Sequence, residues 1–528
     1  MSATAPVVSG IELWLDPLLD SLPPLAIFDA HAHFGADCDG RRRRGRRQAA
    51  PTRRPMLKRT IKIIAVLAAL LGAGDAKAAG LLEPHPQSQP VYGVRGPVSV
   101  RVDGVHGKQV LVDTWLPAAR AGVAPPARVP VVLQYGPYFE PGVARSQAME
   151  LLVSRGYAFS QAHVPGTGGS SGCFDQNAAG EQADGARVVD YLGRRAPFSD
   201  GNVGMMGLSY PGATTLEVAA SPERALVAPL KAIVTLSASA SLYDFFFHDG
   251  VPNFSQSLTS TTYDVLENGF VTGKTGAQDD IAARFVCQPR QLAAVAGDSG
   301  DMTPFYRHRD VSRQVGRITA ATFMAHGHAD RRVSSHAVAG VFDRLPPGTP
   351  RTGLFGVWGH ERPPQAEFEP MMVAWLDRWL KGLDTGADHW PVAQVESTDG
   401  RWREVSEWPG VPGPRRALAP SAGGVLGAAH PTGASRYLES APELEGAAIQ
   451  QPPGTYASFE TASQPERLEL IGSPELDAWV SLTMPDAHIA AELEALGPDG
   501  KRIRLEARVV GLRSMRHLDP LVNGRFVQ

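Results

Sequence analysis

The hydrophobic and polar positions of this chain first follow the pattern of antiparallel strands, and further along they predict strands and helices in alternation. Between residues 92 and 116 apolar and polar residues alternate, which predicts antiparallel strands that open a sheet. Short apolar runs then alternate with stretches that favour helices. We expect strands over 129–134, 157–162, 202–206, 232–236, 318–324 and 353–357, and helices over 146–155 and 182–195. Strand and helix in turn predict an α/β fold with a largely parallel sheet.

The pattern changes twice outside this alternation. Residues 243–317 interrupt it with only a weak strand signal. Beyond Lys381 the chain shows short alternating runs, including 468–471, 479–482 and 503–510. Turn signals such as Asp399-Gly400 and Asp499-Gly500 separate these runs and favour hairpins. We therefore expect a β sandwich at the C-terminal end.

Composition narrows the class of protein. The chain has 528 residues, of which 43% are hydrophobic, enough for two or three domains with their own cores. Its formal net charge of −3 argues against a nucleic-acid partner. The 55 glycines and 44 prolines suit a loop-rich enzyme better than a helical bundle.

A secretory signal peptide is predicted at residues 56–78. Residues 56–62 are basic, residues 63–71 are apolar, and Ala76-Lys77-Ala78 has the small residues of a cleavage site. The apolar run is too short to span a bilayer, so we expect an exported protein, periplasmic or extracellular, with no membrane contact in the mature form. Met56 is then the expected start, and residues 1–55 an extension read in error or a fusion scar.

Two histidines within residues 1–55 have the spacing of a metal-ligand motif. His31 and His33 share one face of a short strand and resemble the first metal-ligand motif of amidohydrolase barrels. The rest of such a barrel is absent, and the arginine-rich run 41–47 that follows is typical of disorder. We therefore expect no metal and no cofactor.

The main chemical signal is Gly207-Leu208-Ser209-Tyr210-Pro211-Gly212, which follows the predicted strand 202–206. A serine between glycines at a sharp strand-to-helix turn is the sequence form of a nucleophile elbow. Gly207 supplies the missing β-carbon that the strained turn needs, and Pro211 suits the first turn of a helix. The pattern departs from G-x-S-x-G, because the second glycine comes three residues after the serine. Ser209 is therefore the predicted nucleophile.

A serine needs a base and a residue that orients the base. In α/β hydrolases the acid and then the histidine follow the serine, each in a loop after a strand. Asp330 follows the strand 318–324, and His360 follows the strand 353–357. We predict Asp330 as the orienting acid and His360 as the base. The competing candidates are His326, His328 and His336 for the base and Glu361 for the acid.

An oxyanion hole requires two donors. The backbone N–H of Tyr210, directly after the nucleophile, is the first predicted donor. Tyr138, after the strand 129–134, could supply a second through its phenol, or could simply pack as an aromatic residue.

Taken together, these motifs resemble the X-prolyl dipeptidyl peptidases and their relatives, the cocaine esterases and α-amino acid ester hydrolases. The matching pieces appear in family order and are Gly136-Pro137-Tyr138, residues 166–172, residues 207–212, Asp330 with Val333, Trp358-Gly359-His360 and residues 375–382. The resemblance implies that Tyr138 is a side-chain oxyanion donor. It also implies a helical cap inserted into an α/β-hydrolase core, and a C-terminal jelly roll.

These implications give a domain division. We expect the hydrolase core over 79–242 and 318–385, the cap over 243–317 and the jelly roll over 386–528. The resemblance implies further strands after the position of Gln528. If the chain lacks those strands, the expected jelly roll is truncated.

The glycine run 166–172 departs from the family at its start. Ala162-His163-Val164-Pro165 stands where many relatives carry an Asp and an Arg-Gly pair, so an ion pair of that kind is not expected here. The run lacks the Lys-Ser/Thr of a phosphate loop and is expected to form a tight active-site turn.

Substrate contacts are less specified. Tyr243, Phe247 and their aromatic neighbours could line an acyl pocket or pack the cap on the core. A dipeptidyl peptidase must bind a free amino terminus through acidic groups, for which Asp244, Asp249 and Glu217 are candidates.

The cysteines allow a disulfide between Cys173 and Cys287 but do not require it. Cys38, Cys173 and Cys287 are the three cysteines, and export permits a disulfide. Cys173 and Cys287 could therefore pair between core and cap, or remain separate buried thiols.

The sequence thus predicts an exported serine hydrolase that acts on a small peptide or amide through an acyl-enzyme. An esterase or acylase of the same family is the alternative, and a catalytically silent binding protein is a reading from another class. The oligomeric state stays open.

Overall fold

A computed structural model provides the fold. It describes residues 81–144, 146–248, 250–252, 300–330, 332–408, 417–421, 423–427, 457–465, 470, 488–497, 500 and 502–511. The predicted signal peptide, the two N-terminal histidines, Asp249, Cys38 and Cys287 lie outside these residues.

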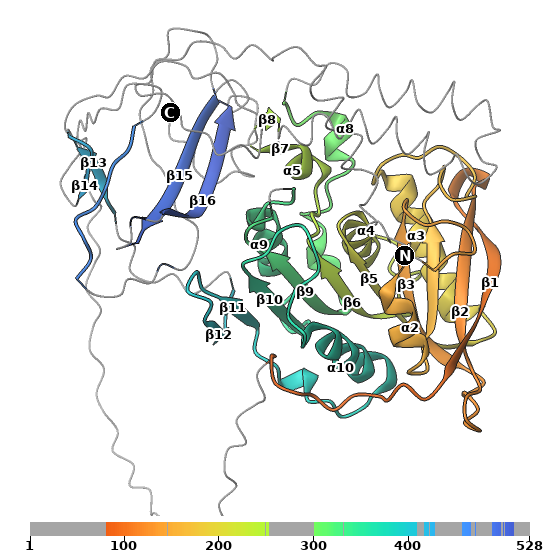
Figure 1. The fold of residues 1–528 in the computed structure, drawn as a ribbon. Coiled ribbons are helices and arrows are strands. Elements are labelled where there is room, and N and C mark those ends of the chain that lie inside the picture. The colour runs from red at the N-terminus through yellow and green to blue at the C-terminus, as the bar shows by residue number, and fades with distance from the viewer. Residues whose placement is uncertain are drawn as a thin grey trace, which may run out of the picture.

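A ten-stranded sheet forms the centre of the described residues (Figure 1), in the order β1-β2-β4-β3-β5-β6-β9-β10-β11-β12. Neighbours from β4 to β11 are parallel, whereas β1 and β2 at one edge and β12 at the other are antiparallel to their neighbours. Its strands are β1 (Gly93–Asp103), β2 (Gln109–Ala118), β3 (Val129–Gly136), β4 (Ala158–His163), β5 (Ser199–Leu208), β6 (Leu230–Leu236), β9 (Ala321–Gly327), β10 (Arg351–Gly356), β11 (Ala393–Glu396) and β12 (Trp402–Val405).

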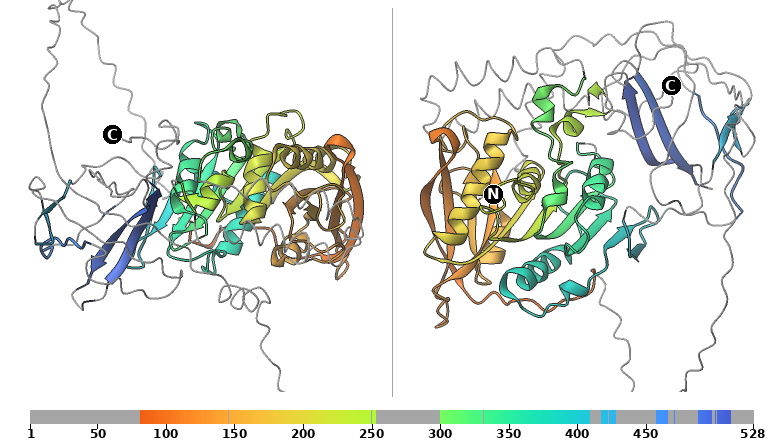
Figure 2. Two further views of the ribbon diagram at one scale, coloured as in Figure 1. Left: turned by 90° about the horizontal axis from the view of Figure 1, so that it is seen from above. Right: turned by 180° about the vertical axis from the view of Figure 1, so that it is seen from behind.

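Helices cover both faces of this sheet, as the opposite views in Figures 1 and 2 show. One face carries α3 (Ala179–Arg194), α4 (Tyr210–Ala219) and α9 (Ser335–Asp343), and the other carries α2 (Gln147–Val153) and α10 (Phe368–Lys381).

Buried residues therefore form two hydrophobic cores. Successive residues of β3 alternate between them, since Val131 and Leu133 belong to the core under α3 and α4, and Val132 to the core under α2 and α10. This period of two explains why the parallel strands read as continuous apolar runs.

The insertion between β6 and β9 is described only at its two ends. These contain α5 (Leu242–Phe246), β7 (Phe247–His248), β8 (Val251–Pro252), α8 (Pro304–Arg307) and a 3₁₀ turn, η6 (Val315–Arg317). Arg309 lies just after α8, and its guanidinium donates to the Asp175 carboxylate over 2.8 Å. This ion pair joins the end of the insertion to the loop that follows the glycine run.

The predicted hairpin at Asp399-Gly400 forms, but it belongs to the core sheet and not to a separate C-terminal sandwich. Strands β11 and β12 flank it, and β11 pairs in parallel with β10 through Ala393 and Val395. Residues 393–405 thus extend the core sheet, whereas we expected them to lie in the C-terminal sandwich. The cause is the exposed edge of β10, which a strand with a buried Ala393 can cover.

Short hairpins make up the described part of the C-terminal region. The second predicted hairpin is confirmed, since β15 (His488–Leu496) and β16 (Arg502–Gly511) pair antiparallel with Gly500 between them; Asp499 lies outside the described residues. A smaller hairpin joins β13 (Ala419–Ser421) to β14 (Val425–Gly427). The predicted strand 479–482 lies outside the described residues, as does 468–471 apart from Leu470. Two further 3₁₀ turns, η1 (Val105–Gly107) and η7 (Ala387–His389), complete the elements.

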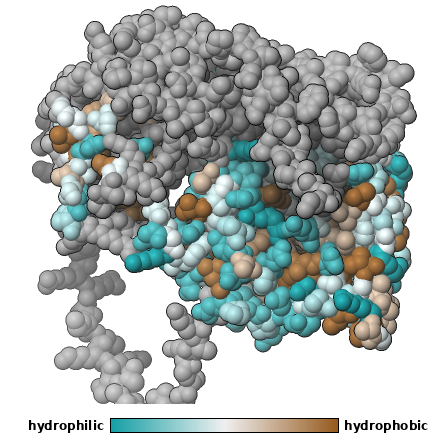
Figure 3. Space-filling model, viewed as in Figure 1, coloured by the Kyte–Doolittle hydropathy of each residue, from teal (hydrophilic) through white to brown (hydrophobic). Residues whose placement is uncertain are grey.

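The surface in the view of Figure 1 mixes hydrophilic and hydrophobic residues (Figure 3). Some of the exposed apolar residues belong to the edge strand β1, including Val94 and Val98. A proline and a register shift between Arg95 and Val98 interrupt this edge, which limits pairing with another strand. Within the described residues, we find no helix whose length and apolar character would let it cross a bilayer.

A buried polar cluster fastens the segment before β1 to the end of α10. The carboxylate of Asp377, which has no solvent exposure, accepts hydrogen bonds from the backbone and hydroxyl of Ser88 over 2.6 and 2.9 Å and from the Tyr157 hydroxyl over 2.7 Å. The Lys381 ammonium lies 2.8 Å from the same carboxylate and 3.8 Å from the centre of the Tyr157 ring. Asp377 of the Trp-Leu-Asp-Arg-Trp motif therefore serves the fold.

Replacing Tyr157 should test this cluster. Tyr157→Phe deletes one donor to a buried charged acceptor, so we expect the free energy of unfolding to fall by about 1.5–3 kcal/mol. Urea denaturation followed by tryptophan fluorescence measures the change. The control is Tyr191→Phe on α3, which removes a hydroxyl from a half-buried ring and should cost less than about 0.5 kcal/mol. Equal effects in both variants would contradict the role of Asp377.

Candidate active site

Ser209 stands at a strained turn between β5 and α4. Its backbone angles are φ 62° and ψ −124°, in a region that residues with a β-carbon rarely adopt. Gly207 makes the turn possible, because an added β-carbon there would lie 2.2 Å from the carbonyl carbon of Pro211. A β-carbon on Gly212 would lie 2.8 Å from that of Ala238. The two glycines therefore let α4 begin directly against the sheet.

The structure brings Ser209, His360 and Asp330 together. The Nε2 atom of His360 lies 2.8 Å from Oγ of Ser209, and its Nδ1 atom lies 2.8 Å from Oδ2 of Asp330. The three residues follow β5, β10 and β9, which are parallel strands of one sheet. Their side chains meet because the carboxyl ends of parallel strands lie at one edge.

Asp330 is held as a carboxylate. Its side chain is buried, and its Oδ1 atom accepts hydrogen bonds from the backbone N–H groups of Arg332 and Val333 over 2.8 and 3.0 Å. Burial by itself would raise the pKa of Asp330, but the hydrogen bond and charge of His360 and the Val333 amide outweigh it and lower the pKa. The carboxylate can therefore fix the imidazole with Nδ1 protonated and Nε2 facing the serine.

The competing histidines lie elsewhere. His326 is buried in β9, and burial lowers its pKa to about 4, which keeps it neutral. His328 packs against Trp408 with a ring separation of 6.0 Å, and burial also lowers its pKa. His336 is on α9, and its side chain lies outside the described residues. Glu361 is exposed beyond His360.

The rings of Tyr138 and Tyr210 lie next to each other. Tyr138 follows β3, the neighbour of β5, and its side chain is 37% exposed. Its ring stands edge-on to the Tyr210 ring with the centres 6.2 Å apart. Tyr210 is the first residue of α4, which places its backbone N–H at the helix start, next to the nucleophile.

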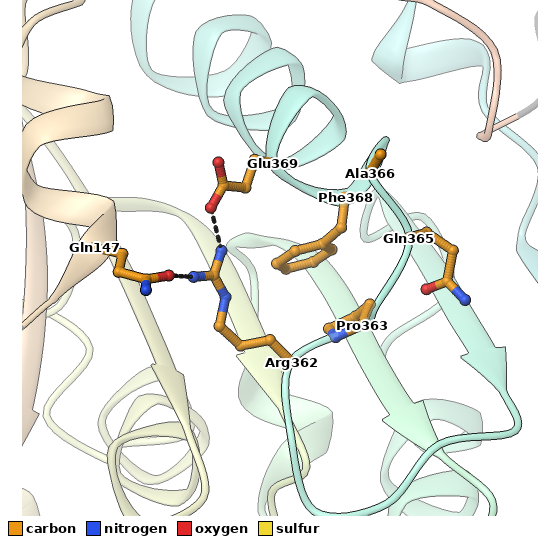
Figure 4. Close-up of a pocket in the computed structure, with 7 residues that line it drawn as sticks. All are labelled: Gln147, Arg362, Pro363, Gln365, Ala366, Phe368 and Glu369. Carbon is orange, nitrogen blue, oxygen red and sulfur yellow. Dashed lines mark hydrogen bonds and ion pairs between the residues drawn. The ribbon is translucent and has the colours of Figure 1, made fainter. Parts of the chain in front are cut away.

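The loop that carries His360 is tied down two residues further on. The guanidinium of Arg362 donates to Gln147 at the start of α2 over 2.8 Å and to Glu369 on α10 over 2.7 Å (Figure 4). These contacts flank a pocket of about 370 Å³ with the buried ring of Phe368 on one side. Arg362 thus joins the histidine loop to the two helices that cover one face of the sheet.

Two buried glutamates, Glu181 and Glu217, lie close to each other, and Glu181 contacts Tyr210. Their proximity was not predicted from the sequence. The Tyr210 hydroxyl donates to Oε1 of Glu181 over 2.8 Å and accepts from the backbone N–H of Asn177 over 2.9 Å. Glu217, one of the three acidic candidates for a substrate amine, is only 3% exposed on α4 and lies near Glu181. Glu217 stands among the apolar residues of α4, which was the available signal, whereas Glu181 lies just before the predicted helix 182–195.

Burial raises the pKa of both carboxyl groups above the usual value. Burial raises the pKa of Glu181 to about 8, against the lowering effect of the hydrogen bonds from Tyr210 and Asn177. Burial and the neighbouring Glu181 together hold the pKa of Glu217 well above its usual value.

The remaining predicted contacts are only partly described. Tyr243 and Phe247 are buried and stack on each other with ring centres 5.2 Å apart, next to Tyr306. They therefore pack the described ends of the insertion and leave little surface for a substrate. Asp244 is half-buried on α5, where its backbone N–H donates to the Ser241 hydroxyl. Asp249 lies outside the described residues.

The glycine run forms a tight turn, as predicted. Gly166, Gly168, Gly169 and Gly172 all have positive φ. Cys173, which ends the run, is disulfide-bonded, and a pairing with Cys287 would involve a residue outside the described part of the chain. Among the described residues, no group of three or more His, Cys, Asp or Glu side chains is arranged to hold a metal ion.

The buried glutamate gives a pH-dependent prediction. The folded protein keeps Glu181 protonated up to a pKa of about 8, whereas the unfolded chain releases that proton near 4.5. The folded state thus binds more protons between these values, so the free energy of unfolding falls as the pH rises from about 4.5 to 8. Glu181→Gln removes this loss, and its stability relative to wild type should increase across this range.

Urea unfolding at pH 5, 6.5 and 8 measures the effect. Glu223→Gln, at an exposed position after α4, is the control and should follow the wild-type pH dependence. A constant difference between Glu181→Gln and wild type at all three pH values would show that Glu181 is ionised in the folded protein.

Comparison with known proteins places this site in a family. Residues 103–362 match the profile of the X-Pro dipeptidyl-peptidases (S15 family), and residues 385–524 match that of the X-Pro dipeptidyl-peptidase C-terminal non-catalytic domain. A putative Xaa-Pro dipeptidyl-peptidase of Streptomyces avermitilis is 27% identical over 83% of this chain and 70% of its own. The cocaine esterase of a Rhodococcus species is 25% identical over 81% of this chain and 85% of its own.

A CocE/NonD family hydrolase from Staphylococcus aureus aligns with a TM-score of 0.48 at 15% identity, over 68% of this chain and 66% of its own. The expected α/β-hydrolase core with a C-terminal domain is confirmed by the family matches and the large mixed sheet, whereas the jelly roll stays a prediction. With both family profiles matched in order along the chain, this protein belongs to the S15 family of serine-type hydrolases, which it shares with the X-Pro dipeptidyl-peptidases and their cocaine-esterase relatives.

Proposed function

We propose that this protein cleaves peptide or amide bonds as an X-prolyl dipeptidyl-peptidase-like hydrolase, through an acyl-enzyme on Ser209. The observation that carries the proposal is the continuous hydrogen-bonded chain from Ser209 through His360 to Asp330, with 2.8 Å at each step. Nucleophile, base and orienting acid are thereby in reach of one another before a substrate binds.

The proposed reaction follows from these contacts. Ser209 attacks the scissile carbonyl while its proton passes to Nε2 of His360, and the Asp330 carboxylate stabilises the imidazolium that forms. The imidazolium then donates the proton to the leaving amine, which departs as the acyl-serine forms. Water then attacks the acyl carbon while His360 takes its proton. The bond to Oγ of Ser209 breaks as His360 returns that proton to Oγ, and the acid product leaves.

We assign the oxyanion hole to the Tyr210 backbone N–H and the Tyr138 hydroxyl. Two observations support the assignment: Tyr210 directly follows Ser209 at the start of α4, and the Tyr138 ring lies edge-on to the Tyr210 ring with the centres 6.2 Å apart. Donors held in place before the reaction stabilise the charge that develops on the carbonyl oxygen.

Substrate choice within the family depends on how an amino terminus would be held. Of the acidic candidates, Glu217 is buried in the core, and Asp244 is half-buried at the start of the insertion. We propose Asp244 as the acid that receives the substrate's amino group. The similarity to the Rhodococcus cocaine esterase, over 85% of that protein, favours an ester-cleaving enzyme as the second candidate.

We also propose that residues 79–242 and 318–385 form the catalytic domain, with a cap over 243–317. The parallel strands β3 to β10 and the helices that cover them support this division. Strands β11 and β12, at the start of the region that matches the C-terminal domain, extend the core sheet.

Substrate assays test the proposed function. We expect hydrolysis of Ala-Pro and Gly-Pro 4-nitroanilides, and a fall of about 10⁴–10⁶-fold in kcat for Ser209→Ala, since the nucleophile carries the covalent step. Asp244→Asn should raise KM for these anilides but not for 4-nitrophenyl acetate, which has no amino group. Cleavage of aryl esters without any cleavage of the dipeptide anilides would overturn the peptidase assignment in favour of the esterase.

We further propose that the protein is exported on the signal at residues 56–78, which combines a basic, an apolar and a small-residue segment. N-terminal sequencing of protein recovered outside the cytoplasm should then begin at Ala79 or a close neighbour. A mature chain that begins at Ser2 would contradict this proposal.

A further inference from the structure

Tyr138 is more than one-third exposed, yet an oxyanion donor must be held in place. The residues around it are buried or hydrogen-bonded, since Phe139 is 6% exposed and Gly142 donates its backbone N–H to a buried carboxylate. The position of Tyr138 is therefore set by what holds the loop 137–143. The inference below rests on the proposed function, because it concerns how that function's donor is positioned.

A buried pair, Asp113 and His163, holds this loop. Asp113 on β2 is 1% exposed and His163 at the end of β4 is fully buried, with Nε2 of the histidine 3.3 Å from Oδ2 of the carboxylate. Burial would raise the pKa of Asp113, but hydrogen bonds from His163, Ser99 and Gly142 lower it, so the group is a carboxylate. Its charge makes the hydrogen bonds it accepts stronger than neutral ones.

Both members of the pair touch the part of the loop that follows Tyr138. The same Oδ2 atom of Asp113 accepts the backbone N–H of Gly142 over 2.7 Å. The ring of His163 meets the ring of Phe139 edge-on, with centres 5.9 Å apart. One contact thus follows Tyr138 directly and the other comes four residues after it.

The glycine run holds His163 from the opposite side. A β-carbon on Gly168 would lie 1.7 Å from Nδ1 of His163, so only a glycine fits against the ring. The Ser170 hydroxyl donates to the His163 carbonyl over 2.7 Å. The imidazole is therefore packed between the turn 166–172 and the loop 137–143.

We propose that Asp113 and His163 are positioning residues, which fix the loop 137–143 so that the Tyr138 hydroxyl reaches the oxyanion. The pair contacts the loop and the glycine turn, and its effect on the reaction passes through Tyr138. A pair that only stabilised the fold would leave the contribution of Tyr138 to catalysis unchanged.

A double-mutant cycle with 4-nitrophenyl acetate tests this. Tyr138→Phe should lose about 10²–10³-fold in kcat, as expected for one oxyanion donor. His163→Ala should lose about 10-fold or more in kcat with little change in KM, but less than about 3-fold when Tyr138→Phe is already present, because residues that act as one unit are not additive. His163→Gln keeps an N–H donor near the Nε2 position and should restore most of the activity.

Two further variants keep the test decisive. Phe139→Leu leaves the buried pair intact and removes only the ring contact, so it replaces His163→Ala if that protein does not fold. Tyr157→Phe is the matched control, since it disrupts a buried polar cluster on α10 and should leave kcat at the wild-type value in both backgrounds.

The outcomes separate the two proposals. Equal losses from His163→Ala, or from Phe139→Leu in its place, with and without Tyr138 would overturn the positioning role and leave the proposed function standing. The same holds if these variants keep full activity. A Tyr138→Phe enzyme as active as wild type would overturn both the oxyanion assignment and the inference built on it.

Discussion

The positive φ of Ser209 is the constraint on which the site depends. A residue with a β-carbon is held in this conformation only because β5 and α4 press together around it, and that contact requires glycine at 207 and 212. The strain turns the hydroxyl away from the sheet edge toward His360. Any change that lets α4 move off the sheet would release the strain and separate the hydroxyl from the imidazole.

The other parts of the site are assembled by the order of strands. β3, β5, β6, β9 and β10 are successive neighbours, and the loops after four of them carry Tyr138, Ser209, Asp330 and His360. The chain brings together residues more than 200 positions apart without a long connection, because each parallel strand ends at the same edge. Arg362 and the pair of Asp113 and His163 then fasten the two outer loops to their surroundings.

Local signals made much of this site predictable from the sequence. The glycines around Ser209 report a backbone requirement, and His360 follows an apolar run short enough to be a strand, so both could be found without tertiary information. The buried glutamates could not, because the burial of Glu181 and Glu217 depends on how α3 and α4 pack. The pair of Asp113 and His163 was missed for the same reason, since its members are 50 positions apart on different strands. The pairing of β11 with β10 in the core sheet could not be predicted either, because no local sequence pattern shows which strand will be the neighbour.

The Asp377 cluster has a consequence for how the catalytic domain opens. Ser88 and Asp377 are 289 positions apart, and they close the described core by joining the segment before β1 to the last turn of α10. If the segment around Ser88 peels away, the buried carboxylate loses two hydrogen bonds, and if the end of α10 peels away, Ser88 and the buried Tyr157 hydroxyl lose their acceptor, so neither end can fray cheaply by itself. The two ends should therefore exchange their amide hydrogens with deuterium together, as one cooperative unit.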